Sequence, residues 1–234
     1  MDKHVQLANW IAANPDRIGK VVDLVAGTDR LLQLDFTENN RELTLADLAV
    51  TERFSAWIDR KVASNNARYG IGGYFEYRTI YGRSALFDTT DEPRRLHLGV
   101  DIWSNAGTPV YVPIDGKVHS YQDNNNFGDY GPTIILEHDL DGIKLYSLYG
   151  HLSRESLSGL YEEKPVDAGE ILGHFGDATE NGQWPPHLHF QLMFDMEGMR
   201  GDYPGVCKYS EMEKYKLNIP DPDLILNFPK GNII

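Results

Sequence analysis

The sequence predicts a mainly β, α+β protein: an antiparallel β sandwich or barrel-like domain with a helical N-terminal extension and a wrapping C-terminal tail. From Tyr69 onward, short runs of β-branched and aromatic residues alternate with turn residues. Before Tyr69, apolar residues recur at helical spacing. After Phe194, Pro and Gly punctuate the chain as far as Pro229. We therefore predict an extension over 1–84, a β domain over 85–200 and a tail over 201–234.

The N-terminal extension contains the predicted helices. Apolar residues from Leu7 to Val25, interrupted at Pro15, predict two short helices, the second starting at Pro15. The segment 31–36 alternates weakly and predicts a strand. A helix pair is expected over 44–63, where Thr44 and Asp47 form a capping-box variant.

The β domain is predicted to consist of short strands joined by tight turns. Asp115-Gly116 predicts a hairpin between 110–112 and 117–121. The segments 133–137 and 143–149 are expected to pair through a turn at 139–142. The run from His187 to Leu192 alternates polar and apolar residues, which predicts a half-buried strand.

The composition limits the classes of partner. The 234 residues include 22 Lys and Arg and 35 Asp and Glu, a net charge of −13. Such a charge disfavours binding to nucleic acid or to an anionic membrane. The single cysteine, Cys207, cannot form an intramolecular disulfide, and we expect it to be a small buried side chain. Residues 1–20 do not resemble a signal peptide, so we expect a cytoplasmic protein as given, or an exported one if a leader was trimmed.

Histidines in the predicted strands indicate a metal site. His187 and His189 share one face of their strand, because side chains two residues apart point the same way. His97 and Asp101 would lie ~13 Å apart on a flat strand, so a bend at Gly99 must bring them together. One imidazole and one carboxylate, together with His189, form a ligand set that Zn²⁺ accepts, and three protein ligands leave a coordination position for water.

Four motifs carry a family resemblance. They are His97-x-x-x-Asp101, Gly107-Thr108-Pro109-Val110, Tyr149-x-His151-Leu152 and Pro186-His187-Leu188-His189-Phe190. Their order and spacing, over about residues 93–194, resemble the lysostaphin/LytM-type zinc metallopeptidases of the duplicated hybrid motif group. This resemblance implies a small antiparallel β domain with a groove over one zinc ion per chain.

The resemblance also implies roles for individual residues. His97, Asp101 and His189 resemble the zinc ligands, and His151 and His187 resemble the histidines that flank the metal-bound water. The implied activity is that of a metalloendopeptidase hydrolysing peptidoglycan-type or other small peptides, with a peptide or muropeptide as substrate. Either His151 or His187 takes the proton of the water, and the other helps zinc to stabilise the oxyanion.

Some features leave other interpretations open. Trp184-Pro185-Pro186 and Gln191 depart from the family pattern near the groove, which affects the expected substrate preference. The alternatives are a non-catalytic, peptidase-like binding scaffold and a cytoplasmic amide hydrolase or accessory module with a non-wall substrate. The extension 1–84 is a candidate cover of the groove, with Asn39 or Asn40 reaching the metal. The other histidines are expected to be structural or on the surface: His4, His119, His138 and His174.

Overall fold

The computed structural model of the chain describes residues 2–89 and 91–234, which form twelve strands and five α-helices. The strands are β1 Leu31–Gln33, β2 Tyr69–Gly72, β3 Leu96–His97, β4 Val100–Trp103, β5 Pro109–Tyr111, β6 Gly116–Asn124, β7 Gly131–Leu140, β8 Ile143–Gly150, β9 Pro165–Val166, β10 Ile171–His174, β11 His187–Met193 and β12 Val206–Cys207. The helices are α1 Lys3–Ala13, α2 Leu45–Leu48, α3 Thr51–Ser64, α4 Met212–Asn218 and α5 Asp223–Leu226. Short 3₁₀ turns join them, among them η1 Pro15–Arg17, η2 Ile80–Arg83 and η3 Ala85–Phe87.

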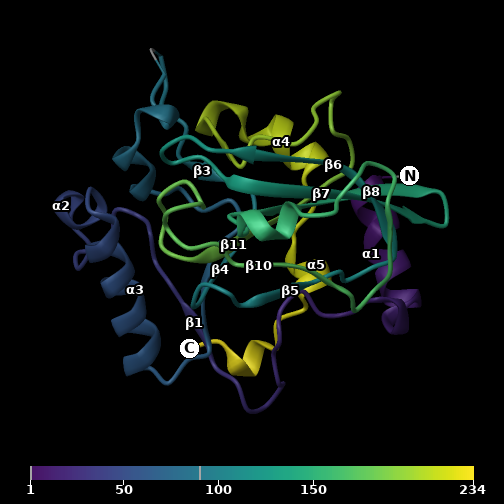
Figure 1. The fold of residues 1–234 in the computed structure, drawn as a ribbon, viewed down its shortest axis with the longest axis horizontal. Helices are drawn as coiled ribbons and strands as arrows, with labels where there is room; N and C mark the ends of the chain where they lie inside the picture. Colours follow the sequence, from purple (N-terminus) through teal and green to yellow (C-terminus); the bar gives the residue numbers. More distant parts are fainter. Residues whose placement is uncertain (1, 90) are drawn as a thin grey trace.

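One large sheet organises the molecule. Its eight strands follow the order β1-β2-β4-β11-β8-β7-β6-β9, and only β1 and β2 pair in parallel. Two small sheets, β10-β5 and β12-β3, accompany it. Helices α2 and α3 lie at one side of the strands and α1 at the other (Figure 1). The mainly β prediction is confirmed, and the described strands form an open sheet because β1 and β9 are its edges.

The helices in the extension agree in part with those predicted from the spacing of apolar residues. The first helix and the pair α2 and α3 are confirmed, and Thr44 and Asp47 cap α2 through reciprocal hydrogen bonds. The second predicted helix is wrong, because only a single 3₁₀ turn starts at Pro15. Beyond that turn the backbone bonds to the β domain: Gly19 N–H donates to Pro113 and Tyr111 N–H to Val21. Tertiary pairing therefore overrides the helical spacing.

The extension also contributes to the main sheet. The predicted strand at 31–36 is present over its first half as β1, which pairs with β2, while residues 34–36 are not in a strand. In turn β2 pairs with β4, which places Gly72 opposite Asp101. The boundary at residue 84 remains a prediction about domains, but the sheet runs across it.

Of the two hairpins predicted in the β domain, one is present and the other is not. Strands β7 and β8 form the expected hairpin, with Leu140 opposite Ile143. The hairpin at Asp115-Gly116 is wrong, because β5 pairs with β10 and β6 pairs with β7 and β9. A turn dipeptide predicts that the chain changes direction, but packing determines which strands pair.

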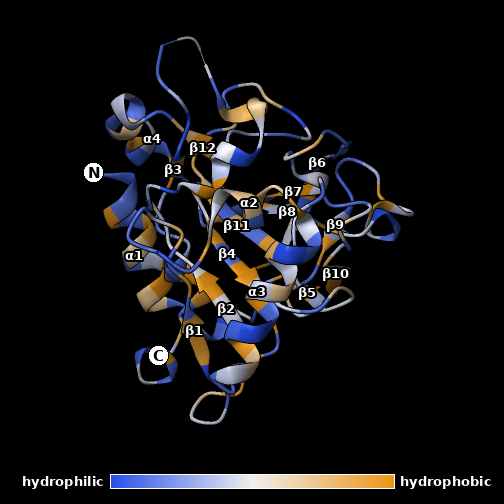
Figure 2. Ribbon diagram, turned by 90° about the vertical axis from the view of Figure 1, so that its left-hand side faces the viewer, coloured by the Kyte–Doolittle hydropathy of each residue, from blue (hydrophilic) through white to orange (hydrophobic). Residues whose placement is uncertain are grey.

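The strand β11 lies between β4 and β8 in the centre of the sheet. Its register places His189 opposite Asp101 on one neighbour and Gly150 on the other. The prediction of a strand is confirmed, but all seven residues are buried, so it is not half-exposed. Hydrophobic colours gather on the central strands and hydrophilic colours on the surrounding loops (Figure 2). No helix in the described part of the chain combines the length and apolar character of a membrane span.

The bend expected at Gly99 separates β3 from β4. The bend lets His97 leave the main sheet, because β3 pairs with β12 in a separate small sheet. Asp101 stays in the main sheet on β4. A Cβ atom on Gly99 would lie 2.7 Å from Cε1 and Nε2 of His189 and from the carbonyl oxygen of Phe190. The bend therefore needs glycine because β11 passes directly over it.

We predict that Gly99→Ala lowers the free energy of unfolding by about 1–3 kcal/mol, because backbone atoms of a central strand must move. Urea denaturation measures the change. Gly231→Ala is the control, because a Cβ there meets no atom within 4 Å. Equal stability of the two variants would contradict this account of the bend.

Candidate active site

Three side chains meet at the junction of β3, β4 and β11. His97 Nε2 lies 2.9 Å from His189 Nδ1 and 3.2 Å from Asp101 Oδ1. The distance from His189 Nδ1 to Asp101 Oδ1 is 3.1 Å. All three residues are at most 3% exposed. Among the described residues, only these form a compact group of potential metal ligands.

Hydrogen bonds on the far side of each imidazole determine where its proton resides. His97 Nδ1 donates to the carbonyl oxygen of Gly73 at 2.8 Å, which leaves Nε2 without a proton in the neutral ring. His189 Nε2 lies 2.9 Å from Gln191 Oε1. The Gln191 amide is oriented by donating Nε2–H to the carbonyl oxygen of Pro204, so Oε1 accepts from His189. We therefore assign the proton of the neutral His189 ring to Nε2.

The consequence is a triangle of lone pairs. His97 Nε2, His189 Nδ1 and a carboxylate oxygen of Asp101 face one another without a proton between them. Ligands ~2.0–2.1 Å from a tetrahedral zinc ion are separated by ~3.3 Å, close to the three distances here. A divalent cation relieves the mutual repulsion of the lone pairs, so the chemistry and dimensions of this donor set fit zinc.

Burial and neighbouring charges together set the protonation states of His97 and Asp101. Burial lowers the pKa of His97 to about 3, and the positive charge of Arg78 lowers it as well. Burial alone would raise the pKa of Asp101, but His97 and Arg78 hold it well below its ordinary value. At neutral pH His97 is thus a neutral imidazole and Asp101 an ionised carboxylate.

Two more histidines lie beside this group. His151 follows the end of β8, and His187 begins β11; their ring centroids are 4.1 Å apart. His151 Nδ1 donates to the carbonyl oxygen of Asn181 at 2.9 Å, and His187 Nδ1 to that of Pro185 at 2.7 Å. Both neutral rings therefore keep an unprotonated Nε2. Burial lowers the pKa of His187 to about 4, and burial followed by the charge of His187 lowers that of His151.

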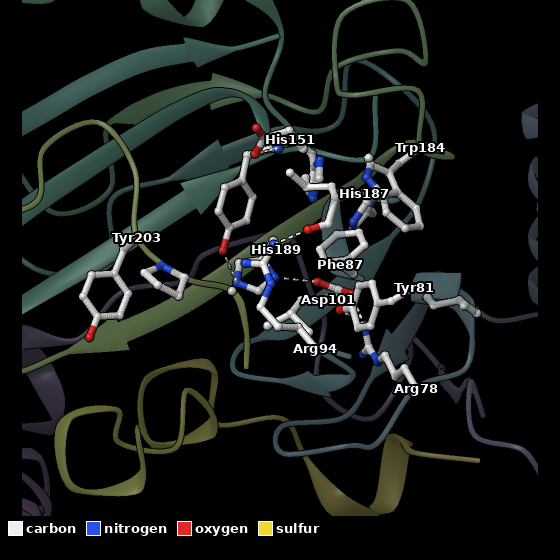
Figure 3. Close-up of a pocket in the computed structure, with 18 of the residues that line it drawn as sticks. Arg78, Tyr81, Phe87, Arg94, Asp101, His151, Trp184, His187, His189 and Tyr203 are labelled. Carbon is white, nitrogen blue, oxygen red and sulfur yellow. Dashed lines mark hydrogen bonds and ion pairs between the residues drawn. The ribbon is translucent and has the colours of Figure 1, made fainter. Parts of the chain in front are cut away.

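Backbone and ring contacts hold these two histidines. His187 stacks on Trp103 with centroids 3.9 Å apart and planes 14° apart. His151 adopts a left-handed φ of 62°, unusual for a residue other than glycine. Its N–H donates to Tyr130 and its carbonyl oxygen accepts from Gly176. With its backbone in this conformation, His151 lies beside His187, as Figure 3 shows.

A cavity of about 210 Å³ opens onto all four of the residues Asp101, His151, His187 and His189. Its other walls come largely from the segments before residue 95 and after residue 200, which we call the flanks. Aromatic and charged side chains from these flanks surround the group in Figure 3, including Tyr81, Phe87, Arg94 and Tyr203. The flanks therefore shape the space that a substrate would occupy.

Sequence reasoning missed a buried arginine in the extension. Arg78 is 0% exposed, and its Nη1 donates to Asp101 Oδ2 at 2.5 Å. Its Nε donates to Glu76 Oε2 at 2.6 Å. No motif surrounds Arg78, and an arginine in a single sequence is expected on the surface. Gln191, noted only as a departure, orients His189.

Other candidates lie elsewhere. Asn39 and Asn40 do not line the cavity, and the Asn40 amide bonds to Asp35 and Glu42 on its own loop. His138 is buried against Ser147, at 2.7 Å from its hydroxyl. His4, His119 and His174 lie outside the ligand group as well.

Cys207 is buried in β12, as expected, and burial raises the pKa of its thiol to about 12. Trp184, one of the departures from the family pattern, is 3% exposed and lines the cavity.

Comparisons with known proteins agree with the motifs. Peptidase family M23 matches residues 95–200. The DD-carboxypeptidase/endopeptidase Mpg of Neisseria meningitidis is 33% identical over 97 residues, 42% of this chain and 20% of that protein. Lysostaphin of Staphylococcus simulans is 35% identical over 99 residues, 42% of this chain and 18% of lysostaphin. The L-Ala–D-Glu endopeptidase of Bacillus subtilis is 28% identical over 126 residues, 52% of this chain and 35% of that enzyme.

A solved structure of the lysostaphin catalytic domain aligns with a TM-score of 0.40 and 27% identity, over 69% of this chain and 97% of that domain. Among the curated relatives, the matched part of this chain spans about a fifth of the length of the Neisseria meningitidis protein Mpg. The family match covers the residues that bear all four motifs, and the sequence matches fall on lysostaphin and related endopeptidases. Residues 95–200 of this chain are therefore a lysostaphin/LytM-type domain of peptidase family M23.

Proposed function

We propose that the protein is a zinc metallopeptidase that hydrolyses peptide bonds, with His97, Asp101 and His189 as the ligands of one zinc ion per chain. The observation that carries the proposal is the convergence of two imidazole nitrogens and one carboxylate oxygen within 3.2 Å of one another in a buried site. Without a cation this arrangement is repulsive, so the fold is organised to receive one. Three protein ligands leave a further coordination position, as in catalytic zinc sites.

When bound at these ligands, zinc would supply Lewis-acid chemistry for polarising a peptide carbonyl and activating water at neutral pH. The protein contributes proton transfer through His151 and His187. Because both Nδ1 atoms donate to carbonyl oxygens, a proton taken from the attacking water goes to Nε2. A ring protonated at Nε2 can then donate to the oxyanion or to the leaving amine. Either histidine can be the general base.

The substrate we propose is a peptide of the peptidoglycan type or another small peptide. The support comes from the matched relatives, which include a DD-carboxypeptidase/endopeptidase, an L-Ala–D-Glu endopeptidase and a glycyl-glycine endopeptidase. Retention of all five histidine and aspartate side chains favours an enzyme over a non-catalytic scaffold. A panel of short Gly- and D-Ala-containing peptides, with intact peptidoglycan beside it, identifies the scissile bond.

We predict about one zinc ion per chain after purification, and loss of both zinc and hydrolysis in His189→Ala, because one of three ligands is removed. Elemental analysis and the peptide panel measure the two results. His174→Ala is the control, since His174 lies outside the ligand group. Stoichiometric zinc in His189→Ala would contradict the proposed ligand set.

We predict a different result for the flanking histidines. His151→Ala and His187→Ala should each retain zinc but lose about 10²–10⁴-fold in kcat, the usual contribution of proton transfer. Zinc content and steady-state kinetics are measured on the same samples. If both variants hydrolyse the best peptide at the wild-type rate, neither histidine transfers a proton in the rate-limiting step.

The role of Gln191 is tested through zinc affinity. Gln191→Leu should weaken zinc binding about 10–100-fold, because His189 loses the acceptor that keeps its proton on Nε2. Gln191→Glu is the matched variant, since a carboxylate can accept the same hydrogen bond. Competition with a chromogenic chelator gives the affinities. An unchanged affinity in Gln191→Leu would show that Gln191 does not control the ring.

A further inference from the structure

Arg78 is a fully buried charged residue next to the ligand group. Its side chain has no exposed surface and makes ion pairs with both Asp101 and Glu76. Nη1 also lies 3.3 Å from the hydroxyl of Tyr81, and Nη2 lies 3.4 Å from the carbonyl oxygen of Gly73. An arginine with so many fixed partners has a single geometry, because its planar fork must satisfy all of them at once.

The surroundings of Arg78 preserve that geometry. Its guanidinium carbon lies 5.3 Å from the ring centroid of Phe36 and 6.0 Å from that of Tyr81. A Cβ atom on Gly72 would lie 2.4 Å from Arg78 Nη2, so only glycine leaves room for the guanidinium at this position. The segment 72–78 is thus shaped around a fixed arginine.

The same segment contacts two of the three proposed ligands. The Gly73 carbonyl oxygen accepts from His97 Nδ1, and Arg78 donates to Asp101. This segment lies outside residues 95–200, where the family matches. The orientation of His97 and Asp101 therefore depends on residues of the extension.

The two carboxylate oxygens of Asp101 have separate partners. Oδ1 faces His97 and His189, whereas Oδ2 accepts from Arg78. A carboxylate can bind a metal through one oxygen or through both. Because the bond to Arg78 occupies Oδ2, only Oδ1 is free to face the cation.

We propose that Arg78 is a positioning residue of the metal centre, which holds Asp101 as a one-oxygen ligand and so keeps the remaining coordination position open for reaction. The inference rests on the proposed function in that it assumes a metal in the ligand group. It adds a role for the extension, which supplies part of the outer shell of the site. Outer-shell partners of this kind determine the orientation and basicity of metal ligands.

Cobalt substitution tests the proposal without relying on activity. Four-coordinate Co²⁺ absorbs visible light more strongly than five-coordinate Co²⁺. Wild-type protein loaded with Co²⁺ should show the strong spectrum, and Arg78→Met a weaker one, because both oxygens of Asp101 become available. Arg78→Lys should recover the spectrum in part. Arg95→Met is the control, since Arg95 forms a partly buried ion pair with Asp88 away from the ligands.

Kinetics and zinc affinity accompany the spectra. Arg78→Met should lose about 10–100-fold in kcat with little change in KM, as expected for an outer-shell partner. An unchanged spectrum with unchanged zinc affinity would overturn the proposal, as would an equal spectral change in Arg95→Met. If Arg78→Met does not fold, Glu76→Gln decides the question, because it loosens Arg78 through its Nε contact. A wild-type protein that binds Co²⁺ but hydrolyses no peptide would refute the proposed function alone, since the spectral comparison still tests Arg78.

Discussion

The structure depends on holding three unprotonated donor atoms together inside the protein. Burying one carboxylate and two imidazole lone pairs within 3.2 Å is costly unless a cation or protons neutralise them. The carbonyl oxygen of Gly73 and the amide oxygen of Gln191 accept the ring protons on the far sides of His97 and His189. The surrounding hydrogen bonds therefore prepare the site for a cation.

The fold of the large sheet brings the side chains of the site together. Strands β4, β11 and β8 are neighbours in the large sheet, so their register brings Asp101 and His189 together and places His151 at the end of β8 beside them. His97 reaches the same point only because the chain bends at Gly99. The flanks complete the site from outside the family match, through Arg78 at the ligands and the cavity walls on either side.

Much of this site could be predicted because its residue types and spacings are rare in combination. Histidines two residues apart on a strand share a face in any sheet, and Gly99 was the only residue between His97 and Asp101 that allows a sharp bend. Arg78 could not be predicted, since its burial depends on pairing between β2 and β4. The missing helix after Pro15 and the absent hairpin at Gly116 have the same cause: tertiary partners replaced local preferences.

The central claim concerns the positions of two protons, and nitrogen-15 NMR of the metal-free protein observes them directly. The account predicts that His97 carries its proton on Nδ1 and His189 on Nε2, and that zinc shifts the resonances of the other nitrogen of each ring. A proton on His97 Nε2 or His189 Nδ1 would mean that an ordinary hydrogen bond joins the two rings, or joins one ring to Asp101, and the account would be contradicted.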